Sequence, residues 1–511
     1  MSNYHINITE FLEESVKKFA DNIAVVENDK TITFKDLYAK VKELSNELSH
    51  ALNGKKNTIV AVLLPKSINS VVADLAILYS GNAYMNLDVS NPKQRLNAII
   101  DQANPSLILT QSKYKFVTEN PHEFGTFFDD DYCFSADVST INTDYRQGLI
   151  DTDPCCVINT SGSTGTPKAV ILNHRSFVDF IESVKTTGFV HDNEIIASLS
   201  PTVFDIYSFE LCMLMTWGST IVVIPEMFAA FPAKLVQYMA EKNISYIFWV
   251  PTIMVNIANL DLLSLIKLPS LRMVWFAGEV FPTAKFNYWR KHLPDCRFVN
   301  FYGPIEITLD CLYHEVVEEL ADNEPIPIGK PFRNTSILVL DEDNLPCTEG
   351  ELCIRGSSLA MGYFNNKEKT SAAFVQNPLN TSYPEIIYRT GDIVKLNDNG
   401  DYVFRGRKDT LIKRMGYRIE LSEIEHVIVD TLKLCKNCCV IYQADTKDIV
   451  LVYESDKELP SREIQNSVKQ ILPKYMIPTK FKFLELMPRN TNGKIDRNAL
   501  KQQLSEWNLG K

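Results

Sequence analysis

The sequence predicts an α/β fold of helix-covered sheets, followed by a β-rich part and a smaller C-terminal part of mixed type. Three observations lead to this prediction. Strand-like and helix-like segments alternate as far as about residue 325, which is typical of parallel or mixed sheets covered by helices. Short strands with Gly and Asn turns then dominate between about residues 326 and 406. From about residue 409 a mixed pattern of helix and strand returns.

The length and composition agree with several domains in a globular protein. A chain of 511 residues is too long for one core, and its 45% hydrophobic and 23% charged residues are ordinary for a globular protein. We expect a large N-terminal domain at residues 1–408, which includes the β-rich subdomain at about 326–406. We expect a small, mobile α+β lid domain at residues 409–511.

Hydrophobic periodicity places the individual elements in order along the chain. Residues 8–22 carry apolar side chains on one helical face, and residues 23–26 and 31–34 are expected to form a hairpin around 28–30. Further helices are expected at 35–52, 68–80, 174–185, 232–242 and 420–428. Further strands are expected at 58–64, 106–109, 155–158, 170–172, 221–224, 246–250 and 437–442.

Charge and cysteine usage exclude several classes of function. The formal net charge of −11 leaves no excess of Lys and Arg for general nucleic-acid binding. The eleven cysteines lie largely inside apolar runs, which favours free thiols in a reducing compartment. Cys435 and Cys438 have metal-like spacing, but no second pair follows, so a metal is disfavoured there. We find neither a signal peptide nor an apolar run of bilayer length, and we expect a cytoplasmic protein with no membrane partner.

One stretch, residues 159–169, is unusually rich in glycine and hydroxyl side chains and contains Lys168. A turn of this kind between two strands can direct several N–H groups and hydroxyls at one anion. It does not fit the Gly-x-x-x-x-Gly-Lys-[Ser/Thr] pattern, because Pro167 precedes the lysine. From composition alone, phosphate binding and a plain polar surface loop remain equally acceptable.

Four more stretches combine glycine turns with charge: Phe301-Tyr-Gly-Pro-Ile-Glu306, Tyr388-Arg-Thr-Gly-Asp392, Arg405-Gly-Arg-Lys-Asp409 and Pro488-Arg-Asn-Thr-Asn-Gly-Lys494. Each alone is compatible with an ordinary turn, but their joint order resembles the adenylate-forming superfamily. Within it, the chain resembles the adenylation domains of nonribosomal peptide synthesis and the D-alanine–carrier-protein ligases. Supporting segments are Ile32–Leu37, Ser80–Asp88, Thr160–Lys168, Phe204-Asp205, Gly350–Gly356, Gly416–Glu420, Leu472–Pro478 and Asn492–Asp496.

The chain departs from the family pattern at two positions. Ile305 stands where the family usually carries Thr, whose hydroxyl commonly contacts the nucleotide α-phosphate. Losing one hydrogen bond to a charged group costs about 1.5–3 kcal/mol unless Thr308 or a water replaces it. Ala169 replaces the usual glycine after Lys168, which is tolerated unless a positive φ is needed there.

The resemblance implies an ATP-dependent, AMP-forming ligase. Such enzymes activate a carboxylate as an acyl-adenylate with release of pyrophosphate, then transfer the acyl group to a thiol. The implied ATP-binding residues are Thr160, Ser161, Gly162, Ser163, Thr164, Gly165, Gly278, Glu279, Phe301, Tyr302, Gly303, Asp392 and Arg407. The implied catalytic residues are Lys494, Glu306 and Lys168, with Glu306 as the Mg²⁺ ligand and Asp409 as the hinge.

Asp205 indicates the class of substrate by resemblance, because amino-acid-activating members carry an aspartate there to pair with the α-ammonium group. A carboxylate facing an apolar acyl chain would be an unpaired buried charge. The implied substrate pocket comprises Asp205, Ile206, Phe209, Trp275, Ala277, Leu309 and Asp310, together with Phe301. Its aromatic members suggest a restricted or aromatic-lined pocket, and Asp310 either meets a polar or cationic side-chain group of the substrate or faces outward.

The expected activity is therefore activation of an amino acid and its transfer to the phosphopantetheine thiol of a separate carrier protein. The chain has no carrier or condensation motif, so we expect a free-standing enzyme. Two alternatives remain open: a fatty-acyl or aryl acid ligase that uses CoA or a carrier, and a catalytically inactive nucleotide-binding regulator. The particular amino acid, its stereochemistry and the carrier are not defined by the sequence.

Overall fold

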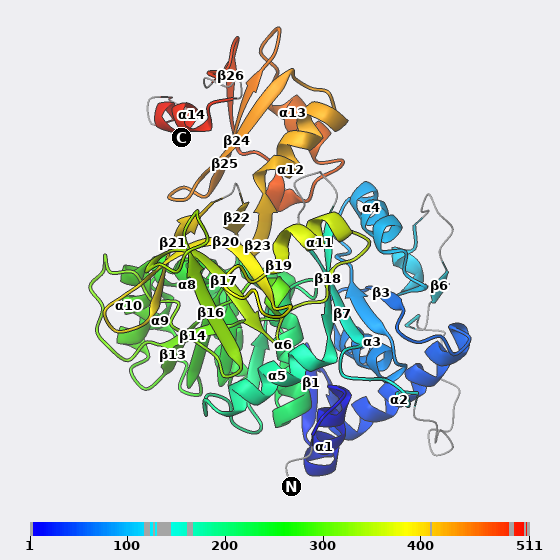
Figure 1. Cartoon of the computed structure of the whole chain (residues 1–511). Coiled ribbons are helices and arrows are strands. Elements are labelled where there is room, and N and C mark those ends of the chain that lie inside the picture. The colour runs from blue at the N-terminus through cyan, green and yellow to red at the C-terminus, as the bar shows by residue number, and fades with distance from the viewer. Residues whose placement is uncertain are drawn as a thin grey trace. The chain divides into compact units, whose positions relative to one another are not determined.

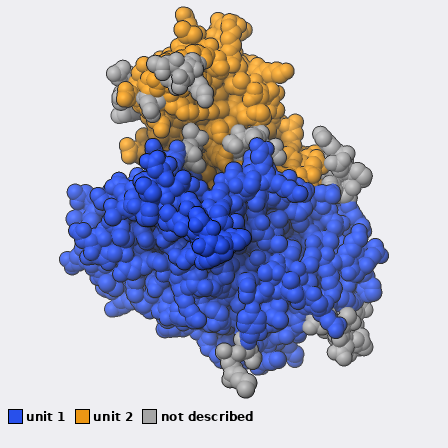
Figure 2. All heavy atoms as spheres, in the orientation of Figure 1, with its two compact units in different colours: residues 1–89, 103–158, 169–408 blue, residues 90–102, 159–168, 409–511 orange. Residues whose placement is uncertain are grey.

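A computed structural model of the chain describes residues 4–116, 123–125, 128–129, 145–160, 167–408, 411–489, 495–504 and 507 (Figure 1). The chain forms two compact units, coloured separately in Figure 2. Unit 1 comprises residues 1–89, 103–158 and 169–408. Unit 2 comprises residues 90–102, 159–168 and 409–511.

The largest sheet of unit 1 has nine strands in the order β15-β14-β13-β12-β11-β9-β10-β1-β2. The strands from β13 to β1 pair in parallel, whereas β14, β15 and β2 pair antiparallel at the two edges. Their bounds are β1 Ile23–Glu27, β2 Lys30–Thr33, β9 Ile195–Ser198, β10 Thr220–Val223, β11 Tyr246–Trp249, β12 Met273–Ala277, β13 Arg297–Tyr302, β14 Leu312–Glu315 and β15 Lys330–Pro331.

A second sheet has seven strands in the order β18-β8-β7-β4-β3-β5-β6. Pairing is parallel from β7 through β6, and β18 pairs antiparallel with β8. Their bounds are β3 Ile59–Leu63, β4 Ala83–Asn86, β5 Leu107–Thr110, β6 Phe124–Gly125, β7 Pro154–Thr160, β8 Lys168–Asn173 and β18 Gly362–Tyr363.

Helices connect these strands, as parallel pairing requires. They are α1 Thr9–Phe19, α2 Phe34–Ala51, α3 Ile68–Tyr79, α5 His174–Lys185, α6 Asp205–Trp217, α7 Pro232–Glu241, α8 Pro251–Asn259, α9 Leu262–Leu265, α10 Thr283–His292 and α11 Lys367–Ala373. Short 3₁₀ segments lie at Ser112–Tyr114, Glu226–Ala230, Ile305–Ile307 and Lys474–Met476. Within the described part of the chain, no helix combines the length and apolarity needed to cross a bilayer.

The strand period of two divides β12 between two hydrophobic cores. Met273, Trp275 and Ala277 pack in the core that contains α3 and α6, whereas Val274 and Phe276 pack in the core that contains α7, α8 and α10. The same alternation puts Tyr246 and Phe248 of β11 in the first core. Helix α6, buried along most of its length, therefore shares one core with this face of the sheet.

The β-rich part is a five-stranded antiparallel sheet with β16-β17-β20-β19 in sequence and β21 paired to β20. Its strands are β16 Thr335–Leu340, β17 Glu349–Gly356, β19 Phe374–Gln376, β20 Ile386–Leu396 and β21 Tyr402–Arg407. All five of these strands lie between residues 326 and 407, the part of the chain that we expect to be β-rich.

Unit 2 contains the hairpin β22 Leu411–Arg414 and β23 Tyr417–Glu420, and the sheet β24 Asn437–Gln443, β25 Asp448–Glu454 and β26 Lys480–Leu484. Its helices are α4 Lys93–Ala103, α12 Leu421–His426, α13 Ser461–Val468 and α14 Arg497–Gln503. The helix predicted at 420–428 is α-helical only to His426 and continues as a π-helix over Val427–Thr431. Arg95 and Glu423, both buried, form an ion pair at 2.6 Å.

Candidate functional site

The carboxyl ends of parallel strands in the nine-stranded sheet bring four of the predicted site residues to one edge. Strands β9, β11, β12 and β13 run parallel, so the segments that follow them emerge at the same edge, where α/β proteins bind ligands. Asp205 begins the helix after β9, Gly278 and Glu279 follow β12, and Gly303 follows β13. Glu279 accepts hydrogen bonds from the backbone N and hydroxyl of Thr252, in the segment after β11, at 3.1 and 2.5 Å.

The turn after β13 is compact enough to require glycine at position 303. A Cβ on Gly303 would lie 2.1 Å from the carbonyl oxygen of Leu309 and 2.5 Å from Cα of Asp310. The backbone of residues 309–310 therefore packs directly against the residue that follows Tyr302. Thr308 and Leu309 adopt positive φ angles of 57° and 66°, which is costly for β-branched and branched side chains and is concentrated at functional sites.

Three of the predicted ATP-binding residues form one hydrogen-bonded group. The Tyr302 hydroxyl donates to one Asp392 carboxylate oxygen, and the Arg407 guanidinium donates to the other. Asp392 on β20 and Arg407 on β21 face each other in the strand register, and Arg407 also donates to the Thr390 carbonyl at 3.0 Å. Burial, and after it the charge of Asp392, raises the pKa of Tyr302 well above its usual value.

Glu306 lies in the 3₁₀ segment Ile305–Ile307 and is 0% exposed. The Tyr363 hydroxyl donates to its Oε1 at 2.8 Å, a partner that the motif pattern did not reveal. No group of three or more potential metal ligands occurs among the residues the structure describes. A single carboxylate fits Mg²⁺ carried by a nucleotide, because that ion takes one or two carboxylates and completes its shell with phosphate oxygens and waters.

Ile305 stands where the family usually carries Thr, and Thr308 is the suggested source of the missing hydroxyl. The two residues lie in different environments. Ile305 packs against the hydrophobic core. Thr308 is 0% exposed, and its hydroxyl has no hydrogen-bond partner among the described residues. Among the described polar side chains of this turn, the Thr308 hydroxyl is the one with no hydrogen-bond partner.

The predicted substrate residues converge between α6 and the sheet. Asp205 opens the first turn of α6, and its Oδ1 accepts a hydrogen bond from the Ile206 backbone at 2.9 Å. Phe209, one turn further, stacks on Trp275 with ring centroids 5.0 Å apart. Ile206, Ala277 and Leu309 belong to the same core. Asp310 is 6% exposed rather than outward-facing, and its charge, after burial, raises the pKa of Tyr246.

The predicted phosphate loop is described only at its two ends. Thr160 ends β7, Lys168 begins β8, and the Thr160 hydroxyl donates to the Lys168 carbonyl at 3.5 Å. Within unit 2, the Lys168 ammonium lies 2.5 Å from a Glu420 carboxylate oxygen. Ser161, Gly162, Ser163, Thr164 and Gly165 lie outside the described residues, as do Asp409 and Lys494.

Sequence reasoning missed a buried polar network that holds α6. Tyr207 donates to Asp74 at 2.9 Å, the Tyr84 and Ser208 hydroxyls lie 2.9 Å apart, and Lys66 pairs with Glu210 at 2.9 Å. Burial raises the pKa of Asp74 to about 7. These contacts join residues far apart in sequence, so no local pattern reveals them.

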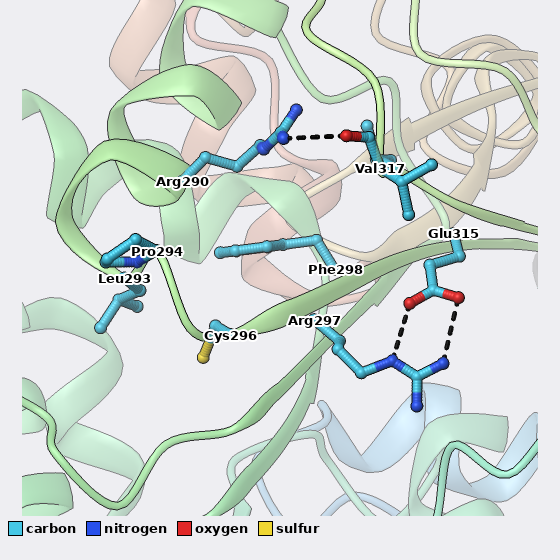
Figure 3. Close-up of a pocket in the computed structure, with 9 residues that line it drawn as sticks. Arg290, Leu293, Pro294, Cys296, Arg297, Phe298, Glu315 and Val317 are labelled. Atoms are coloured by element: carbon cyan, nitrogen blue, oxygen red, sulfur yellow. Dashed lines mark hydrogen bonds and ion pairs between the residues drawn. The ribbon is translucent and has the colours of Figure 1, made fainter.

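A surface pocket of about 190 Å³ lies elsewhere in unit 1, between the end of α10 and strands β13 and β14 (Figure 3). None of the predicted site residues lines it. Its two arginines are already engaged: Arg297 forms a two-point ion pair with Glu315 at 2.7 and 3.0 Å, and Arg290 donates to the Val317 carbonyl at 3.2 Å. The pocket is therefore not part of the candidate site.

Comparisons with known proteins identify the family of the chain. Residues 12–364 match the model of the AMP-binding enzyme family. Tyrocidine synthase 1 from Brevibacillus parabrevis is 31% identical over 97% of this chain but over 45% of its own length, so the chain spans less than half of that relative.

Two solved structures show the same fold. One is holo-PA1221, a nonribosomal peptide synthetase protein with adenylation and carrier (PCP) domains bound to a vinylsulfonamide inhibitor. It has a TM-score of 0.83 and 22% identity over 98% of this chain and 84% of its own. The other is the Vibrio cholerae adenylation domain AlmE with glycyl-adenosine-5'-phosphate, with a TM-score of 0.83 and 21% identity over 99% of both chains.

The fold, the order of the motifs and the matched family model all agree, and the α/β prediction is confirmed. The chain belongs to the AMP-binding enzymes, the adenylate-forming superfamily that includes the adenylation domains of nonribosomal peptide synthesis.

Proposed function

We propose that the protein activates an amino acid as its aminoacyl-adenylate and transfers it to the phosphopantetheine thiol of a carrier protein. The observation that carries the proposal is Asp205, a carboxylate at the start of α6 whose neighbours on that helix, Ile206 and Phe209, are buried among apolar side chains. Asp205 itself is half-buried, and a carboxylate beside apolar side chains is favoured where a cation can pair with it. An α-ammonium group supplies that cation, whereas a fatty acid does not.

The surrounding residues suit ATP. Tyr302 offers an aromatic face beside Gly278 and Gly303, and Asp392 offers carboxylate oxygens for a ribose diol, with Arg407 holding its orientation. Thr160, residues 161–165 and Lys168 are assigned to the β- and γ-phosphates. Glu306 is assigned to the Mg²⁺ that neutralises phosphate charge.

Two chemical steps follow from this assignment. An oxygen of the substrate carboxylate attacks the α-phosphorus, the bond between the α- and β-phosphates breaks, and pyrophosphate leaves. The carrier thiol, after losing its proton, then attacks the acyl carbon and displaces AMP. Lys494 is assigned to the charge that builds during the first step. Asp409 is assigned as the hinge between residues 1–408 and 409–511 that changes the face presented to the thiol.

The carrier assignment is supported by the PA1221 structure, in which an adenylation domain occurs together with a carrier (PCP) domain. The amino-acid assignment is supported by AlmE, which is in complex with glycyl-adenosine-5'-phosphate. At 22% and 21% identity these likenesses establish the fold, and Asp205 carries the extension to this chain.

Exchange of labelled pyrophosphate into ATP tests the proposal, measured with each amino acid and with a series of fatty and aryl acids. We expect exchange with at least one amino acid, and its loss in Asp205→Asn with retention of ATP binding. Exchange with fatty or aryl acids alone would refute the role of Asp205. A folded, ATP-binding protein that exchanges with no acid would instead be a nucleotide-binding regulator.

Lys494→Ala separates binding from chemistry. We expect this variant to bind ATP and to lose exchange, because the lysine acts only on the developing charge. Wild-type exchange in the variant would show that another group performs this role.

A further inference from the structure

Strand β20 is irregular at the point where it presents Asp392. Its residues 390–392 lie opposite the single residue Leu352 of β17, because the register between the two strands shifts there. Gly391 has a φ of 72°, in the left-handed region. Extra residues of this kind take backbone groups out of the ladder and change the direction of side chains, and they are common beside binding sites. The direction of the Asp392 side chain therefore depends on what holds this bulge.

One buried carboxylate, Glu351 of β17, holds the bulge from the side. It is 6% exposed. Its Oε1 accepts a hydrogen bond from the Gly391 backbone N–H at 3.1 Å. Its Oε2 accepts two hydrogen bonds from the Arg389 guanidinium, at 2.9 and 2.7 Å, and one from the Lys408 ammonium at 3.4 Å. Burial favours the neutral acid, but the hydrogen bonds and charge of Arg389 outweigh it, so the pKa of Glu351 is lowered overall.

These contacts reach both members of the ion pair between Asp392 and Arg407. Gly391, bound to Glu351 through its N–H group, directly precedes Asp392. Lys408, bound to Glu351 through its ammonium group, directly follows Arg407. The Lys408 backbone N–H also donates to the Gly391 carbonyl at 2.8 Å. Glu351 therefore joins the two chain segments that present the pair.

We propose that Glu351 is a positioning residue of the nucleotide site, which holds the bulge so that the Asp392 carboxylate meets the ribose hydroxyls. The inference rests on the proposed function, which assigns Asp392 to the ribose. Glutamine cannot replace Glu351, because its amide offers one acceptor oxygen and one NH₂ donor. Either the Gly391 N–H or the Arg389 guanidinium would then face a donor, and the bulge would have to move.

The first test compares ATP with 2',3'-dideoxy-ATP, which lacks both ribose hydroxyls, by isothermal titration calorimetry in the presence of Mg²⁺. We expect Glu351→Gln to weaken ATP binding about 10-fold or more, as misplaced hydrogen bonds to a charged group do. Binding of the dideoxy analogue should stay within about 2-fold, because it makes no contact with Asp392. Unchanged ATP affinity, or an equal loss for both nucleotides, would overturn the inference.

The matched control is Glu349→Gln, on the same strand. Glu349 is exposed, pairs with Lys395 at 3.5 Å and has the same chemistry, so its loss should leave both affinities unchanged. Melting curves confirm that the variants fold. Glu351→Asp keeps the charge but withdraws the carboxylate by one methylene. It replaces Glu351→Gln if that variant does not fold, and the same two results decide.

A double-mutant cycle supplies the second test. In the Asp392→Asn background, Glu351→Gln should cause no further loss of ATP affinity, because Glu351 acts through Asp392. Additive losses would overturn that coupling.

These measurements need no acid substrate, so they decide on Glu351 even if pyrophosphate exchange fails with every acid. Equal affinity of the wild type for the two nucleotides would overturn the ribose role of Asp392 and this inference together, without bearing on which acid is activated.

Discussion

Asp74 makes the stability of the chain depend on pH in a way that can be calculated. Burial raises its pKa from 3.8 to about 7, while hydrogen bonds from Asn86 and Tyr207 partly oppose the rise. The folded protein therefore holds a proton that the unfolded chain releases above pH 4. A carboxylate with a raised folded-state pKa lowers stability as pH rises from about 4 to about 7, and the loss is complete above pH 7.

The change Asp74→Asn removes this titration. Between pH 5 and pH 7 the wild type should lose about 2 kcal/mol of unfolding free energy that the variant keeps, because the slope of about 1.4 kcal/mol for each pH unit flattens as the pH approaches the folded-state pKa. In the variant, the amide nitrogen takes the place of the Asp74 Oδ1, which has no hydrogen-bond partner among the described residues. Its N–H donors are therefore buried without an acceptor, which lowers the unfolding free energy by a constant amount of about 1–3 kcal/mol. That cost is the same at every pH, so the slope with pH isolates the carboxylate.

Urea unfolding at pH 5, 6, 7 and 8 measures this slope for the wild type and Asp74→Asn. Asp21→Asn, at an exposed carboxylate, is the matched control and should follow the wild type. Titrations of other groups cancel in the difference between wild type and variant. Parallel curves for wild type and Asp74→Asn would refute the reasoning and would show that Asp74 ionises normally inside the fold.

Three further predictions concern the histidine beside α1 and the turn after β13. His174 is 2% exposed, and burial lowers its pKa to about 4. The unfolded chain therefore binds a proton that the folded protein does not, so the unfolding free energy of the wild type should fall by about 3 kcal/mol between pH 6.5 and pH 4 relative to that of His174→Gln. Equal acid unfolding of both proteins would contradict this prediction. Gly303→Ala should abolish pyrophosphate exchange and lower stability by about 1–3 kcal/mol, because its Cβ would lie 2.1 Å from the Leu309 carbonyl oxygen. The control Gly400→Ala, where a Cβ meets nothing within 4 Å, should cost only the left-handed strain of about 1 kcal/mol and keep activity. Thr308→Val should keep or raise the melting temperature, because it removes a buried hydroxyl that has no hydrogen-bond partner among the described residues. The same variant should slow pyrophosphate exchange. A lower melting temperature with unchanged exchange would assign the hydroxyl a purely structural role.

The sequence motifs anticipated the site where its residues follow one another closely in a turn. Tyr302, Gly303 and Glu306 share one segment, and Asp392 and Arg407 are assigned to ATP by resemblance, but the hydrogen bond from Tyr302 to Asp392 is found only in the structure. The helices and strands were also anticipated, because their periodicity is local. The C-terminal end of α12 could not be predicted, because the π-helix at Val427–Thr431 departs from the α-helical period that the pattern assumes.

Contacts that depend on strand order could not be read from the sequence. Phe248 and Trp275 meet because β11 and β12 are neighbours in register, and Phe209 joins them because α6 covers that face. The hydrogen bond between Tyr207 of α6 and Asp74 of α3 joins residues that are 133 positions apart in the chain. Such pairings follow from sheet topology, which a single sequence without repeats or internal symmetry does not specify.

The close packing of Gly303 on the backbone of Leu309 and Asp310 has a consequence for how such an enzyme can diversify. The close approach across this turn involves the Gly303 α-carbon and main-chain atoms of residues 309 and 310, and not the side chains of Leu309 and Asp310. A substitution at 309 or 310 that keeps the backbone conformation therefore leaves this contact in place. Under the proposed function, this turn lets selection change which amino acid is accepted while the position of the reacting phosphate is inherited unaltered.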